Sequence, residues 1–130
     1  MVLWASTHKE KVVDLLTPEI VKLSYARANV VREIWLDLWF KDPTIIKALL
    51  DCFEGLDTSV NWAGFTRLRY FDIEVKIYGH VDSPEAYIEK LEKDTRAKFR
   101  QLERQVGVEF GVKFILIWFE FTIPYIFYFM

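Results

Sequence analysis

The sequence contains few residues that could build a covalent or metal scaffold. Its 130 residues include one cysteine, Cys52, and two histidines, His8 and His80. One thiol cannot form a disulfide within the chain, and the spacing of these three residues matches no zinc motif. The first residues also lack the pattern of a secretory signal. We therefore expect an intracellular (cytoplasmic) chain that needs no cofactor and no metal to fold.

Glycine is equally scarce, with five residues that are never clustered. Loops that hold phosphate through backbone amides need closely spaced glycines, so the common nucleotide-binding loops are excluded. The strained turn that exposes a catalytic serine in many hydrolases also needs flanking glycines, and none is present. The sequence therefore offers no motif that predicts an enzyme.

The chain has little excess charge and no clean membrane segment. Its net charge is −2, with an isoelectric point near 5.7, whereas nucleic-acid-binding proteins usually carry a basic surface. The run from Gly111 to Met130 is long enough to span a bilayer, but Lys113, Glu120 and Pro124 interrupt it. The alternation in this run favours a strand over a lipid-facing helix, so we do not expect a membrane partner.

Apolar and aromatic residues are abundant instead. They make up 52% and 17% of the chain, with a mean hydropathy of +0.10, which is high for a soluble domain. The only side-chain amides are Asn29, Asn61, Gln101 and Gln105, a scarcity typical of thermophiles and suited to an archaeal or viral source. The apolar excess predicts a very full core or a surface that binds a partner.

The N-terminal region carries signals for helices. Thr7 and Glu10 form a capping-box pattern, and Thr17 followed by Pro18 is a second start signal. We therefore predict that residues 1–29 form a helical extension.

Residues 30–40 alternate between two faces. Ile34, Leu36, Leu38 and Phe40 share one face, which favours a half-buried strand. The apolar residues of this segment could also continue a long helix from residue 20, so both structures remain open at this stage.

Two further helices have clear start signals. One begins at Asp42 and Pro43 and is expected to end at Gly55, and the other runs from Ser83 to about Gln105.

The remaining segments read as strands. Residues 65–81 are predicted as a hairpin region with a bulge or turn near Tyr70, because the alternation changes register there. Residues 108–123 are apolar on both faces, which is typical of a strand buried on both sides, and residues 124–130 form an apolar tail.

The order from residue 30 is therefore strand, helix, hairpin, helix and strand. This is the order of the ferredoxin-like split βαβ sandwich, β-α-β-β-α-β, in the α+β class. We predict one domain over residues 1–130, in which residues 30–123 form the sheet and its helices.

The apolar C-terminal region leads to the functional prediction. We expect a non-enzymatic interaction or assembly protein of unknown pathway, either a homodimer or a subunit of a larger complex. The predicted contact residues lie in the last predicted strand and the tail: Phe119, Phe121, Ile123, Tyr125 and Phe127.

Two alternatives from other classes remain. The first is a nucleic-acid-binding module that stacks bases on an aromatic sheet face and contacts phosphates through a basic helix. Its residues would be Trp35, Trp39, Arg96, Lys98, Arg100 and Arg104. The second is a Mg²⁺-dependent phosphoryl-transfer enzyme whose carboxylates, Asp37, Asp72 and Glu74, converge on the sheet.

Overall fold

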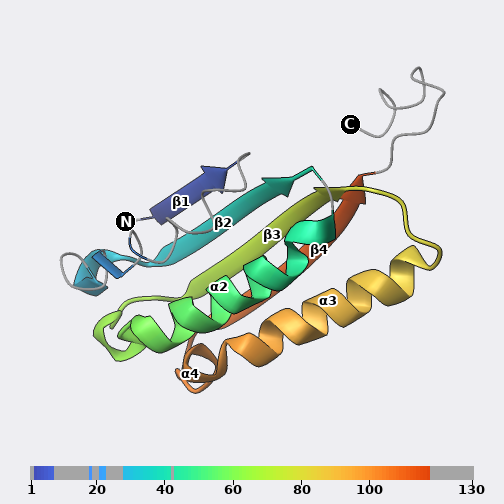
Figure 1. Ribbon diagram of the computed structural model, residues 1–130. Coiled ribbons are helices and arrows are strands. Elements are labelled where there is room, and N and C mark those ends of the chain that lie inside the picture. The colour runs from blue at the N-terminus through green and yellow to red at the C-terminus, as the bar shows by residue number, and fades with distance from the viewer. Residues whose placement is uncertain (1, 8–17, 19–20, 23–27, 42, 118–130) are drawn as a thin grey trace.

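The computed structural model describes residues 2–7, 18, 21–22, 28–41 and 43–117. Within them, four strands form one sheet in the order β1-β2-β3-β4, and every neighbouring pair is parallel (Figure 1). The strands are β1 (Val2–Thr7), β2 (Glu33–Phe40), β3 (Tyr70–Tyr78) and β4 (Glu109–Ile117). The alternating residues of segment 30–40 thus form a strand over Glu33–Phe40, as their pattern predicted, and not the continuation of a helix.

Helices connect the parallel strands. They are α2 (Ile46–Ser59) between β2 and β3, and α3 (Pro84–Lys98) with the short α4 (Arg100–Glu103) between β3 and β4. Single 3₁₀ turns, η1 (Ala28–Val30), η2 (Pro43–Ile45) and η3 (Trp62–Gly64), complete the described elements. Each strand lies next to the preceding one, always on the same side of it. Crossover connections of the same hand therefore place α2 and α3 on the same face of the sheet (Figure 1). None of the described helices is long and apolar enough to cross a membrane.

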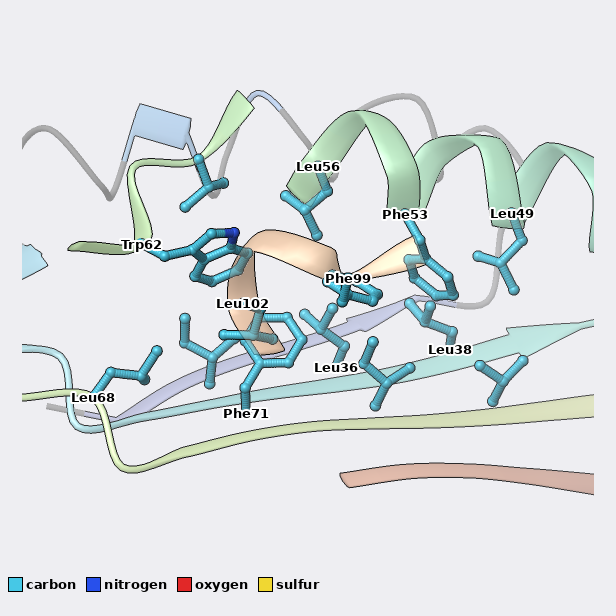
Figure 2. Packing of buried hydrophobic residues seen from close by; sticks show 14 of the residues in the cluster. Leu36, Leu38, Leu49, Phe53, Leu56, Trp62, Leu68, Phe71, Phe99 and Leu102 are labelled. Atoms are coloured by element: carbon cyan, nitrogen blue, oxygen red, sulfur yellow. The ribbon is translucent and has the colours of Figure 1, made fainter. Parts of the chain in front are cut away.

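The core lies between this helical layer and the sheet. Alternate residues of β2 and β3 are buried, and Figure 2 shows them facing the apolar side of α2. The sheet contributes Ile34, Leu36, Leu38, Phe40, Phe71, Ile73, Val75 and Ile77, and α2 contributes Leu49, Phe53 and Leu56. The polar residues between them therefore lie on the opposite face of the sheet.

Aromatic rings form the centre of this core. Phe99 lies between α3 and α4, and its ring centroid is 5.4 Å from Phe53, 5.6 Å from Phe71 and 5.0 Å from Phe110. Trp62 packs edge-on against Phe71 at 5.3 Å. Such tilted and edge-on contacts are the favoured geometries for aromatic pairs, so the rings stabilise a defined packing of helices on sheet.

The topology differs from the ferredoxin-like prediction. A split βαβ sandwich has an antiparallel sheet with a central hairpin, whereas here all described strands are parallel and lie in sequence order. Residues 65–69 form no strand; Phe65 and Leu68 are buried and hold a turn before β3. The coarser prediction, a mixed α+β chain with a sheet and helices, is confirmed.

The boundaries of three elements also differ from those predicted. Val2–Thr7 is a strand, whereas the helical extension predicted over residues 1–29 lies for the most part outside the described residues. Helix α2 continues through Gly55 to Ser59, because Leu56 follows Phe53 on the buried side. The long helix predicted to Gln105 breaks at Phe99, which leaves helical backbone angles and inserts its ring into the core.

Candidate functional site

The outer edge of β4 is the most distinctive surface of the described residues. β4 ends the sheet, and no described strand pairs with its outer side (Figure 1). The Glu109 amide donates to Arg69 and the Ile117 carbonyl accepts from Gly79, so odd-numbered residues direct their backbone groups toward β3. Because successive residues point to opposite sides, the backbone groups of Val112, Phe114 and Leu116 face outward.

Arg96 of α3 covers the start of this edge. Its guanidinium donates to the Phe110 carbonyl at 2.9 Å and lies 5.2 Å from the centroid of the Phe110 ring. The same side chain reaches Glu103 at 3.6 Å. An edge carbonyl that is capped by a side chain cannot accept from another strand, so the accessible part of the edge begins after Phe110.

The side chains along the accessible edge are almost all apolar. Val112 and Leu116 are half-buried against the core, Phe114 is buried, and Ile115 and Ile117 are half-buried on the opposite face. Lys113 is the one charged residue between Val112 and Ile117 and it is exposed. An apolar edge with outward backbone groups is what strand addition by another chain requires.

The face of the sheet opposite α2 and α3 is called the far face. Its described residues in β2 and β3 are the exposed Tyr70 and the half-buried Glu33, Trp35, Asp37, Trp39, Asp72, Glu74, Lys76 and Tyr78. Lys76 is its central cation: Nζ lies 3.2 Å from Asp37 Oδ1, 3.7 Å from Glu74 Oε1 and 4.3 Å from the Trp39 ring centroid. Lys76 therefore neutralises the acidic charge of this face only around Asp37 and Glu74.

Asp72 lies on the far face above Gly111 of β4. The two residues are register partners, and a Cβ atom at Gly111 would collide with the Asp72 carboxylate, so glycine leaves room for it. Burial raises the pKa of the Asp72 carboxyl above its ordinary value of 3.8, and Glu109 and Glu33 raise it further. The folded protein therefore favours the protonated form of Asp72 more than the unfolded chain does.

We expect Asp72→Asn to stabilise the protein at neutral pH. A group whose pKa is raised on folding contributes stability below its unfolded pKa and loses it as the pH rises through the folded value. Asparagine does not ionise, so the variant avoids that loss. The gain in the free energy of unfolding should be about 0.5 kcal/mol at about pH 7, because Asp72 is only half-buried, and it should vanish at about pH 3. Urea unfolding at both values measures it. Glu74→Gln, which removes an ion-pair partner of Lys76, is the control and should give no gain; an equal gain at both pH values would exclude ionisation as the cause.

The structure does not bring the predicted nucleic-acid contacts onto one surface. Trp35 and Trp39 lie on the far face, whereas the basic residues lie on the helical layer at the other side of the sheet. Trp35 donates to Glu33 at 3.2 Å. Of the helical cations, Arg96 is bound to the edge of β4 and Lys98 lies 3.5 Å from Glu54, while Arg100 and Arg104 are exposed.

The predicted magnesium ligands are neighbours without forming a cation site. Asp37 and Glu74 are register partners on adjacent strands, but the Lys76 ammonium lies within ion-pair distance of both. Asp72 pairs with Trp35 and Gly111 instead. Across the described part of the chain, no group of three histidine, cysteine, aspartate or glutamate side chains could hold a metal ion.

The predicted contact residues Phe119, Phe121, Ile123, Tyr125 and Phe127 lie outside the described residues. They follow β4 directly in the sequence. Comparison of the chain with protein-family models, with curated proteins and with solved structures finds no match.

Proposed function

We propose that this chain is a non-enzymatic assembly protein that pairs with a second copy of itself through the outer edge of β4. The observation that carries the proposal is the accessible edge from Val112 to Leu116, whose outward backbone groups meet no described strand. Unpaired strand edges that are apolar and flat recruit other strands, and proteins usually block those that are not used.

A two-fold axis through Phe114 gives a pairing that uses the accessible edge and avoids the capped part. In this antiparallel register, Phe114 pairs with Phe114 of the second copy, and Val112 pairs with Leu116. These outward-facing residues form the hydrogen-bonded pairs of an antiparallel ladder. Phe110, whose carbonyl is held by Arg96, lies outside the paired segment. A closed two-fold dimer follows, rather than an open chain of subunits.

The same register places no like charges opposite each other. Lys113 of one copy faces Ile115 of the other, and Gly111 faces Ile117. Like charges directly opposite on paired strands are destabilising, whereas an aliphatic side chain can pack along the lysine methylenes. A pairing centred on Lys113 itself would bring two ammonium groups together, so charge disfavours that register but not the one centred on Phe114.

The test is the solution mass of a variant that removes one outward amide. Val112→Pro lacks the N–H that would donate to the second copy, and proline is tolerated on an edge strand where that N–H faces away from the sheet. We expect the native chain to have twice its 15.5 kDa mass by size-exclusion chromatography with light scattering, and Val112→Pro to have 15.5 kDa.

Val112→Thr is the matched control because it keeps the amide and the branched side chain. It should remain a dimer at two concentrations about tenfold apart, whereas a weak dimer would dissociate on dilution. Thermal unfolding of Val112→Pro checks that the monomer is folded. A native chain that is monomeric at both concentrations, or a Val112→Pro variant that remains dimeric, would contradict the proposal.

A further inference from the structure

A second feature lies at the amino end of the sheet, away from the accessible part of the β4 edge. There a hollow of about 480 Å³ is lined by residues from three segments that precede β2, β3 and β4: Arg32, Thr66, Arg67, Leu68, Arg69, Val106 and Gly107. We infer that this hollow binds the phosphate group of a small phosphorylated molecule through Arg32, Arg67 and Arg69.

Backbone hydrogen bonds fix the three segments relative to one another. The Arg32 carbonyl accepts from the amides of Arg69 at 2.8 Å and Tyr70 at 3.3 Å. The Arg69 carbonyl in turn accepts from the amide of Glu109 at 2.7 Å. Leu68 is buried and anchors its turn beneath the arginines. The arginine side chains therefore project from a preformed frame, which reduces the entropy lost when a ligand is bound.

The charge of the hollow is uncompensated among the described residues. Arg32, Arg67 and Arg69 are exposed, and each lacks an ion pair with a described carboxylate, although the described residues hold several such pairs elsewhere. None of the described residues that line the hollow is acidic. Three cations around one concavity repel one another, and an anion seated between them removes that repulsion.

The chemistry of the lining favours phosphate. A guanidinium presents paired N–H donors that match two oxygens of a phosphate, and Thr66 adds a hydroxyl donor. Gly107 adopts a positive φ of 84° and leaves open space at the rim, so the ligand can enter there. Val106 is fully exposed beside it and offers an apolar contact to the rest of the ligand.

The test is a titration of the ¹⁵N-labelled full chain, followed by amide chemical shifts, with inorganic phosphate and with phenyl phosphate as separate probes. We expect saturable shifts at the amides of Thr66–Tyr70 and Val106–Gly107. Arg67→Ala with Arg69→Ala should weaken binding by about tenfold or more, since each removes a hydrogen bond to a charged group. The paired lysine variant keeps the charge and should lose less.

Arg100→Ala with Arg104→Ala is the control, because it removes the same charge from exposed positions outside the hollow and should leave the affinity unchanged. Tighter binding of phenyl phosphate than of inorganic phosphate would support a phosphorylated molecule with an apolar group. Shifts that never saturate, or equal losses in both double variants, would overturn the inference. The inference would also be overturned if neither phosphate probe bound and a single-stranded oligonucleotide did. The slope of its log binding constant against log salt concentration would then lie well beyond about −2, the slope for three phosphates. None of these outcomes depends on dimer formation, so failure here leaves the assembly proposal untouched.

Discussion

A chain carrying both Lys113→Cys and Ile115→Cys is expected to form a covalent dimer under mild oxidation. In the register centred on Phe114, residue 113 of one copy lies directly opposite residue 115 of the other, in a non-hydrogen-bonded pair. Cα atoms in such pairs are about 4.5 Å apart, within the range that a disulfide spans. Because the axis is two-fold, two disulfides form, and a non-reducing gel should show nearly complete conversion to twice the monomer mass.

The two single-cysteine variants are the controls for this experiment. Residue 113 lies diagonally from residue 113 of the second copy, about 7–8 Å away, which is too far for a disulfide of normal geometry. Each single variant should therefore remain uncrosslinked. The native Cys52 is replaced by alanine throughout, so that all thiols lie on β4. Equal crosslinking of a single variant would mean another register, and no crosslinking of the double variant would count against pairing at this edge.

The alternation of apolar residues predicted which faces of β2 and β3 are buried. Ile34 to Phe40 and Phe71 to Ile77 occupy the core side, with polar residues between them, as period-2 patterns require. Burial alone sets this pattern, so it can be recognised locally from the sequence.

The direction of the strands could not be predicted in the same way. A polar far face is typical of an antiparallel sheet, because most parallel sheets are covered on both sides and have apolar residues at nearly every position. Asp72, Glu74 and Lys76 give β3 such a polar face, although this strand is parallel to both of its neighbours. The direction depends on how the helical crossovers pack, and that is not encoded in the alternation of a single strand.

Site residues were missed where the contacts are distant in sequence. Arg32, Arg67 and Arg69 meet only because their strands begin at the same end of the sheet. Asp57 lies beyond Gly55, where the helix was expected to end. Its position next to Leu56, in continuation of the apolar spacing from Leu49 and Phe53, was the signal that the helix extends this far.

Asp57 is expected to be the polar residue on which folding depends most. It lies on α2 with 2% of its surface exposed, and its carboxylate accepts three hydrogen bonds. Oδ1 accepts from Trp62 Nε1 and from the Leu102 amide, both at 3.0 Å, and Oδ2 accepts from the Gln101 amide at 2.8 Å. The last two amides belong to α4, which begins where α3 breaks at Phe99. One carboxylate thus joins α2, η3 and α4 above the aromatic core.

Asp57→Ala leaves the amides of Gln101 and Leu102 without their acceptor inside the protein, whereas Trp62 Nε1 keeps its bond to the backbone carbonyl of residue 57 at 3.1 Å. Each unsatisfied buried group costs about 1–3 kcal/mol, so the free energy of unfolding should fall by about 3 kcal/mol or more. Asp57→Asn keeps one oxygen but turns an NH₂ group toward a donor, and its loss should be intermediate. Asp51→Ala on the exposed side of the same helix should change stability by less than about 0.5 kcal/mol.

Urea unfolding measures these differences, and the Val112→Pro background keeps association from contributing to the measured stability. The comparison of Asp57→Ala with Asp51→Ala shows whether the Asp57 carboxylate is needed for stability. If Asp57→Ala lost no more stability than Asp51→Ala, the two hydrogen bonds to Gln101 and Leu102 would not hold α4 in place. The packing of Phe99 between Phe53 and Phe71 would then have to account for the break between α3 and α4 by itself.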